Sequence, residues 1–158
     1  MELRSVIAAA KVNIKVGSWK NGKIPKSDFP IAKSAYRLGN SYRWCIVGFD
    51  AMDETFRCAV VFNAGKVKYE AIFGFLVNQT LKILCSYQFH EGEPGWHCHA
   101  TCKADANSTP GLMRGPWITR IPAASSRHRR MSFGVDGEDK AVQIALARYR
   151  IETKGPLL

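Results

Sequence analysis

The sequence predicts an α+β fold: a mainly antiparallel meander sheet of about five strands, with a short N-terminal helix and a C-terminal amphipathic helix packed on one face. Three observations lead to this prediction. Residues 42–103 contain runs rich in β-branched and aromatic residues, the breaks between these runs are short and made of turn-forming residues, and the last segment carries apolar residues at helical spacing. Breaks this short permit antiparallel hairpins but no parallel crossovers.

The length and composition are those of one folded domain. The 158 residues are 46% hydrophobic and 23% charged, which is close to the globular average and far from the composition of disordered chains. A chain of this length buries enough apolar surface to fold without metals or disulfides. We therefore expect a single domain over residues 1–158.

The N-terminal residues 1–26 are expected to form a basic, irregular arm. Its second half, residues 11–26, has five lysines and no acidic residue, and two glycines and a proline interrupt any regular pattern. A short strand over Val12 to Val16 fits within this arm.

A short helix is predicted around residue 30. Ser27 or Asp28 is a suitable cap, Pro30 is acceptable in a first turn, and Gly39 directly after Leu38 is a typical terminator. This is the short N-terminal helix of the predicted fold.

The segment 42–103 is expected to form the β-meander. Its apolar runs are SYRWCIVGF, TFRCAVVF, KVKYEAIFGFLV, TLKILCSYQFH and WHCHATCK, and its breaks are DAMDE, NAG, NQ and EGEPG. Because short apolar runs are ambiguous by periodicity alone, residues 66–77 also fit a helix.

Residues 104–130 predict a long basic loop, and residues 137–150 predict the C-terminal helix. The loop has three prolines and no periodicity, with at most a short strand near PWITRI. The helix begins after Asp136, a suitable cap, and its apolar residues recur at helical spacing at Val142, Ala145, Leu146 and Tyr149.

The stretch FHEGEPGWHCHATC, residues 89–102, holds three of the four histidines. Strand alternation places Trp96, Cys98 and Cys102 on one face and His97 and His99 on the other. A hairpin with its loop at Gly92–Gly95 would set His90 opposite His97 and Cys85 opposite Cys102, so His90, His97 and His99 would form a compact triangle.

Three readings of this triangle stay open. Three imidazoles on one face can hold a divalent metal such as Zn, Mn or Mg and leave a position open for water. They can instead be exposed histidines on the solvated side of a hairpin, which needs no function. A structural zinc site of mixed Cys and His ligands is disfavoured, because the cysteines point to the other face.

The residues His97-Cys98-His99 resemble the His-hydrophobe-His motif of single-strand endonucleases, relaxases and replication initiators. That resemblance implies a divalent metal on a strand of an antiparallel sheet and a nucleophilic tyrosine on a helix, for which Tyr149 is the candidate. Helical periodicity, however, places Tyr149 on the apolar stripe of the last helix.

The stretch GWHCHA is also similar to the GW-x-H-S-H stretch of zinc isopeptidases of the JAMM type, in which an upstream glutamate completes the site. Glu70 is the candidate for that glutamate. The family's serine and its spaced aspartate are missing here, because the next acid after His99 is Asp105. The metal site of that family is therefore not carried over.

The charge predicts an anionic partner. Lys and Arg number 23 against 13 Asp and Glu, a formal net charge of +10, which suits nucleic acid. Arginines with an aromatic residue between them can grip phosphates and stack bases. The residues of this kind in the basic segment are Arg114, Trp117, Arg120, Arg127, His128, Arg129 and Arg130.

The cysteines predict a reducing compartment. Their number, five, is odd, and they lie within apolar runs instead of being spread through loops as in secreted disulfide scaffolds. No apolar run reaches transmembrane length and the N-terminus lacks a signal-peptide core. We expect a cytoplasmic protein without a membrane partner.

Together these features predict a nucleic-acid-interacting protein, with metal-assisted phosphodiester cleavage by the histidine cluster as its activity. The alternative is a non-enzymatic module or accessory subunit that binds another protein through its basic surface or its sheet. The sequence does not decide between DNA and RNA.

Overall fold

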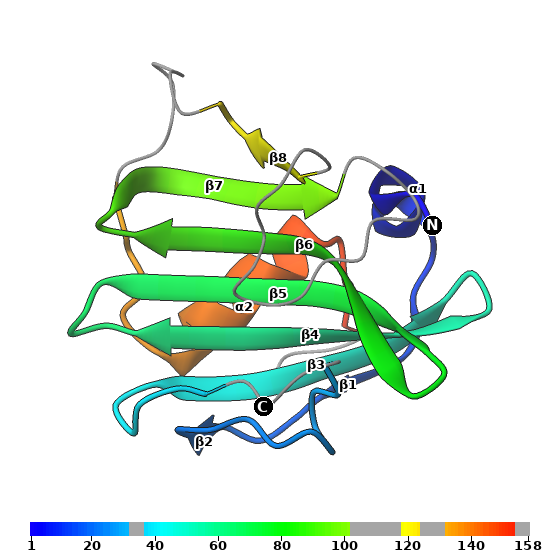
Figure 1. Cartoon of the computed structure of the whole chain (residues 1–158), viewed down its shortest axis with the longest axis horizontal. Helices are drawn as coiled ribbons and strands as arrows, with labels where there is room; N and C mark the ends of the chain where they lie inside the picture. Colours follow the sequence, from blue (N-terminus) through cyan, green and yellow to red (C-terminus); the bar gives the residue numbers. More distant parts are fainter. Residues whose placement is uncertain (32–36, 102–117, 124–131, 154–158) are drawn as a thin grey trace.

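The protein is an α+β structure built on one antiparallel sheet (Figure 1). The computed structural model describes residues 1–31, 37–101, 118–123 and 132–153. Its elements in chain order are α1 (Leu3–Ala8), β1 (Val12–Val16), β2 (Lys20–Asn21), β3 (Arg43–Ala51), β4 (Glu54–Asn63), β5 (Lys68–Val77), β6 (Thr80–His90), β7 (Glu93–Thr101), β8 (Ile118–Ile121) and α2 (Glu138–Arg148).

The fold class is confirmed, but the expected number of strands is wrong. The described residues form an eight-stranded sheet in the order β1-β3-β4-β5-β6-β7-β8, with β2 also paired to β3. Of the three short additional strands, β1 is the strand expected at Val12 to Val16 and β8 lies within PWITRI, where at most a short strand was expected, whereas β2 was not predicted. Short strands at a sheet edge carry little apolar periodicity, so the sequence signal for them is weak.

The central part of the sheet is the expected meander. Strands β3 to β7 follow one another in the chain, pair antiparallel with their neighbours and are joined by tight turns. Residues 68–77 form strand β5, so the helical interpretation of that segment is wrong. Pairing with neighbours on both sides overrides the ambiguous periodicity of the run.

Each face of the sheet carries a cluster of buried apolar residues. Helix α2 lies across the back face in Figure 1. There Phe49, Phe56 and Phe73 stack with centroids 5.2 to 5.8 Å apart, and Tyr149 stacks on Phe73 at 4.6 Å. A smaller apolar cluster covers part of the front face; its buried members are Ile24, Phe29, Ile31, Trp44, Ala59, Val61, Ile72, Leu81 and Ile83.

Helix α2 is fixed to the sheet by side-chain hydrogen bonds to backbone groups. The Tyr69 hydroxyl donates to the Ala141 carbonyl at 2.8 Å, and the Tyr149 hydroxyl donates to the Ala71 carbonyl at 2.7 Å. Arg43 on β3 forms an ion pair with Glu138 in the first turn of the helix. These contacts and the apolar stripe orient the helix, so its prediction from periodicity is confirmed.

A bulge divides strand β6 between the two faces. The register shifts between the pairs Phe73↔Cys85 and Gly74↔Ile83, which leaves Leu84 as an additional residue. A Cβ on Gly74 would lie 2.3 Å from the Lys82 carbonyl oxygen, so only glycine fits there. Regular strand alternation would put Ile83 and Cys85 on one face, but because of the bulge Ile83 packs in front and Cys85 packs behind.

The back face also carries a group of thiols beside α2. Cys45, Cys58, Cys85 and Cys98 are all buried there as free cysteines. Burial raises the pKa of Cys45 to about 12, whereas a hydrogen bond from Cys85, together with Arg148, lowers the pKa of Cys98 to about 6. The expectation of thiols inside apolar strands is confirmed for these four residues.

The helix expected near residue 30 is not found in the residues described there. Residues 27–31 form turns, with the Asp28 and Phe29 amides donating to the Pro25 carbonyl, and the rest of the prediction falls on residues 32–36, outside the described part. The short N-terminal helix of the structure is α1. Neither helix of the described residues is long and apolar enough to cross a membrane.

Candidate metal centre

The site is built on the hairpin of β6 and β7, whose register differs from the expected one. Gln88 pairs with His97 and Ser86 pairs with His99, so the strands are shifted by two residues from the predicted pairing of His90 with His97. His90 pairs with Glu93 around a turn at residues 91–92. A shift of two residues in the pairing keeps every side chain on the same face of the sheet, so the alternation of apolar and polar residues cannot distinguish the two registers.

The hairpin accommodates this register through an irregularity between the Gln88 and His90 pairs. Strand β7 has more residues between Glu93 and His97 than strand β6 has between their partners, His90 and Gln88. Gly95, which lies in this stretch, has a φ of 97°, a conformation that glycine adopts readily. This irregularity turns the Glu93 carboxylate back toward the histidines.

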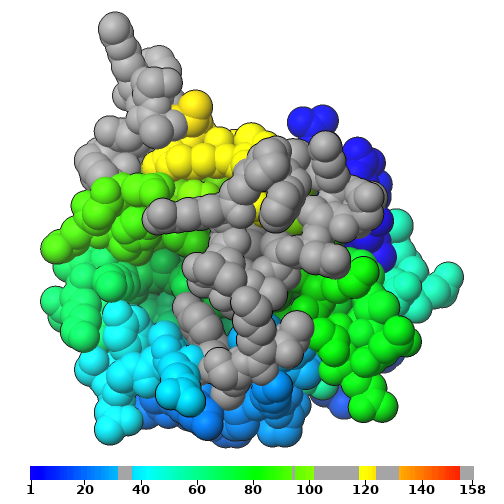
Figure 2. All heavy atoms as spheres, in the orientation of Figure 1, coloured from blue at the N-terminus to red at the C-terminus, as the bar shows by residue number. Residues whose placement is uncertain are grey.

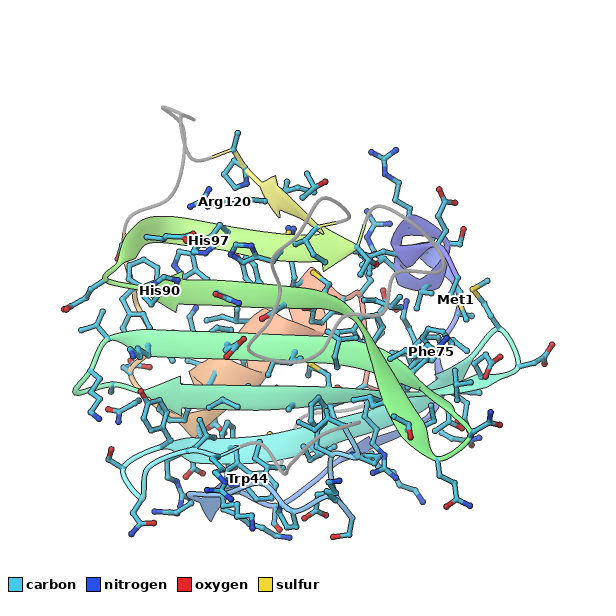
Figure 3. The ribbon with its side chains drawn as sticks, in the orientation of Figure 1. Met1, Trp44, Phe75, His90, His97 and Arg120 are labelled. Carbon is cyan, nitrogen blue, oxygen red and sulfur yellow. The ribbon has the colours of Figure 1, made fainter. Side chains whose placement is uncertain are left out.

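The structure brings the three predicted histidines together on the front face. The rings of His90 and His97 have centroids 5.4 Å apart, and those of His97 and His99 are 5.1 Å apart. In Figure 3 His90 and His97 lie at the same end of neighbouring strands, with Arg120 of β8 beside them. The interpretation as exposed histidines is wrong for His97, because its side chain is 0% exposed.

Glu93 is the centre of the cluster, and its role was not predicted. Its Oε2 lies 3.1 Å from Arg120 Nε, 3.3 Å from His97 Nε2 and 3.8 Å from His99 Nε2. Burial opposes the charge on Glu93, but the hydrogen bond from Arg120 and the facing imidazoles, in their protonated form at low pH, together outweigh it and lower the pKa of this carboxyl. The carboxylate is therefore ionised at neutral pH.

The tautomer of His97 follows from its hydrogen bonds. Its Nδ1 lies 2.8 Å from the Gly95 carbonyl oxygen, which can only accept, so Nδ1 carries a proton. Its Nε2 is buried and has no hydrogen-bond partner within the described part of the chain, although Glu93 Oε2 is 3.3 Å away. Burial lowers the pKa of His97, which favours the neutral ring, so Nε2 presents a lone pair toward a carboxylate.

His90, Glu93 and His97 could hold a metal ion. One ligand atom from each residue can be chosen so that all three lie within 4.8 Å of one another. His99 contacts Glu93 but does not belong to this group in the described part of the chain. Two imidazoles and a carboxylate are a usual ligand set for zinc and for non-haem iron.

A pocket of about 200 Å³ adjoins the cluster on the front face. His90, Gln88 and Phe89 form one of its walls, and Lys68, Tyr69 and Glu70 form another, with Leu38, Tyr42 and Val61 completing it. Glu70 accepts hydrogen bonds from Ser86 at 2.7 Å and from Gln88 at 3.2 Å. A candidate metal ligand, His90, and a polar wall therefore share one cavity.

Most of the predicted phosphate-binding residues lie outside the described part of the chain. These are Arg114, Trp117, Arg127, His128, Arg129 and Arg130. Arg120 is described, and it lies on β8, which forms the upper rim of the front face in Figure 2. Its guanidinium hydrogen-bonds to Glu93, so it orders the acidic member of the cluster.

The nucleophilic role implied for Tyr149 by the His-hydrophobe-His resemblance conflicts with the structure. Tyr149 is 1% exposed, packs on Phe73 and donates its hydroxyl to a backbone carbonyl behind the sheet. His97 and His99 lie on the opposite face. A tyrosine separated from the candidate metal centre by the sheet cannot attack a substrate bound there.

The fold and the site thus define an α+β protein with a candidate metal centre on a β-hairpin. Comparison with protein-family models, with curated proteins and with solved structures finds no match to this chain.

Proposed function

We propose that the protein is a metal-dependent hydrolase of phosphodiesters, with His90, Glu93 and His97 as ligands of a zinc ion. Zinc is commonly held in catalytic sites by two histidines and a glutamate, with water in the fourth position. Such a metal supplies a hydroxide near neutral pH and polarises a phosphoryl oxygen.

The single observation that carries the proposal is the arrangement around His97 Nε2. Among the described residues this buried atom has no hydrogen-bond partner, and it faces Glu93 Oε2 at 3.3 Å, while Nδ1 donates to Gly95. A lone pair and a carboxylate repel each other at this distance unless a cation lies between them. The hydrogen bond at Nδ1 is also the outer contact that metal-bound histidines usually make.

The surroundings support a substrate that carries phosphate. The pocket beside His90 holds Lys68 and Gln88, a cation and an amide that can contact phosphate oxygens. The net charge of +10 would attract a polyanion such as nucleic acid. We therefore propose nucleic acid as the substrate class.

Metal binding is tested by titrating chelator-treated protein with Zn²⁺ and with Co²⁺, whose absorption reports nitrogen and oxygen ligands. We expect one ion per chain, and His90→Gln, Glu93→Gln or His97→Gln should weaken binding by more than about a hundredfold. His99→Gln is the matched control, because it removes a histidine that contacts Glu93 but should reduce the metal affinity much less. Absence of stoichiometric binding by the wild-type chain would contradict the metal site.

Hydrolysis is tested separately on bis(p-nitrophenyl) phosphate, single-stranded DNA and single-stranded RNA. We expect turnover only in the metal-loaded protein, and loss of turnover in His97→Gln. Stoichiometric metal binding without cleavage of any of these substrates would retain the metal site and reject the hydrolase.

A further inference from the structure

Behind the sheet, on the face opposite the metal centre, two cysteines contact each other. Cys85 on β6 and Cys98 on β7 lie diagonally across the ladder, because Cys85 pairs with Ala100 and Tyr87 pairs with Cys98. Their side chains both point to the back face, and the two thiols are near enough to shift each other's pKa. We call Cys85 and Cys98 the thiol pair.

A cation is held against one member of the thiol pair. Arg148 Nη2 lies 3.2 Å from Cys98 Sγ, and the guanidinium lies over the Tyr87 ring at 4.8 Å from its centroid. The stacking on Tyr87 fixes the guanidinium plane in front of the sulfur. The other described back-face cysteines, Cys45 and Cys58, have no such arginine contact among the described hydrogen bonds.

An open groove leads toward this cation. It has a volume of about 470 Å³, and it is lined by Tyr87, Lys140, Gln143, Ile144, Ala147 and Arg148. Two of these residues, Tyr87 and Arg148, are the ones that contact the thiol pair or stack beside it. Tyr87 and Arg148 therefore border both the groove and the surroundings of Cys98, whose own side chain is buried.

We propose that the thiol pair is a peroxide-reactive site, in which Cys98 is oxidised first and Cys85 then closes a disulfide with it. This inference is independent of the proposed hydrolase. The oxidant is a small hydroperoxide that enters through the groove, with hydrogen peroxide as the simplest member of the class.

The two steps balance as follows for hydrogen peroxide. The Cys98 sulfur attacks one peroxide oxygen, the O–O bond breaks, and the thiol becomes a sulfenic acid while the second oxygen leaves as water. The Cys85 sulfur then attacks the Cys98 sulfur, the S–O bond breaks, and a disulfide and a second water form. Sulfur gives up two electrons in total and the peroxide accepts them.

The role of Arg148 is electrostatic. Negative charge develops on the leaving oxygen when the O–O bond breaks, and a fixed guanidinium stabilises it without reorganisation. Cys85 is placed to resolve the sulfenic acid, because it lies diagonally opposite Cys98 on the adjacent strand with its side chain on the same face. Cys58, which is 0% exposed and lacks the cation, is the matched residue without this chemistry.

The test uses the full chain carrying Cys102→Ser, since Cys102 lies outside the described residues. The protein is treated with hydrogen peroxide and digested without reductant, and its peptides are analysed by mass spectrometry. We expect a Cys85–Cys98 disulfide. With Cys85→Ser, Cys98 should be trapped as a dimedone adduct, while Cys45 and Cys58 stay unmodified in both proteins.

Arg148→Met should slow the reaction of Cys98 by about ten- to a hundredfold, the effect of losing one hydrogen bond to a charged group, and Arg148→Lys should recover part of the rate. If Arg148→Met does not fold, the oxidation rates of Cys98 and Cys58 within the folded parent chain still test the proposal. Oxidation of Cys98 no faster than Cys58, or a sulfenic acid that survives with Cys85 intact, would overturn the proposal.

Discussion

At the scale of single residues, the candidate site shows what strand alternation can and cannot predict. The shared face of His97 and His99 follows from the period of two, and the structure places both in front. The contribution of Glu93 to the candidate site could not be predicted from strand alternation, because it depends on the irregular path of β7 and on the φ of Gly95. A carboxylate within a turn is ordinarily solvent-facing, so the sequence offered no distinctive signal for it.

The metal-free protein should lose stability as the pH falls below 6.5, the ordinary pKa of His97. Its pKa is lowered in the folded state, so the unfolded chain binds a proton first and acidification favours unfolding. The stability supplied by neutral His97 is present above pH 6.5 and is lost as the pH falls through the lower, folded pKa. Urea unfolding at a series of pH values measures this.

His97→Gln is the control for that measurement, because it removes the titrating ring from the same position. The variant should have a flatter dependence of unfolding free energy on pH in the range just below 6.5. Glu93 acts in a separate window, below its ordinary pKa of 4.5, where protonation removes its contact with Arg120. Equal slopes for both proteins near pH 6 would contradict the assignment to His97.

At the scale of elements, the meander and the C-terminal helix could be predicted because their apolar patterns are long. The register of the β6–β7 hairpin and the faces of β6 could not be predicted. A slip of two residues preserves alternation, and the additional residue Leu84 reverses alternation within one strand. The glycine at position 74 was the only sequence sign of that bulge.

Gly74→Ala should destabilise the protein by about 1–3 kcal/mol, the usual cost of forcing an additional group into a packed site. The new Cβ would lie 2.3 Å from the Lys82 carbonyl oxygen, which belongs to the backbone and cannot swing away. Gly48→Ala is the matched control within a strand, since its Cβ would meet the Phe56 carbonyl oxygen at an ordinary 3.9 Å. Urea denaturation of both variants measures the difference; equal stability would argue against a rigid bulge.

Tyr149→Phe should lower the free energy of unfolding by about 0.5–1.5 kcal/mol, because one buried hydrogen bond to Ala71 is lost. The aromatic stacking on Phe73 should persist. Any hydrolytic activity should remain unchanged, since the hydroxyl lies behind the sheet. Complete loss of activity in a folded variant would restore the nucleophilic role implied by the His-hydrophobe-His resemblance.

At the scale of the whole molecule, the charge and the fold class were readable from composition and pattern, whereas the eight-stranded sheet was not. Strands β1, β2 and β8 are stabilised by pairing with long neighbours, not by their own periodicity. The arrangement of the candidate metal centre likewise depends on distant segments, because Arg120 reaches Glu93 from β8. Such contacts between remote parts of a chain leave no local pattern.

Binding to single-stranded nucleic acid should weaken steeply with salt if the net charge of +10 contacts phosphates. Fluorescence anisotropy at increasing NaCl gives the slope of log affinity against log salt concentration. Arg127→Ser combined with Arg129→Ser and Arg130→Ser should make that slope shallower by about one unit per lost contact. Absence of binding at low salt would reject nucleic acid as the partner.

The neighbouring residues His97 and Cys98 point to opposite faces of β7, and this has a consequence for metal selection. Thiolates bind soft metals more strongly than imidazole does and would capture zinc or copper if they shared the front face. The backbone of the strand separates the sulfur atom of Cys98 on the back face from the nitrogen and oxygen atoms of the candidate metal centre on the front face. One strand can thus keep two incompatible chemistries a single residue apart.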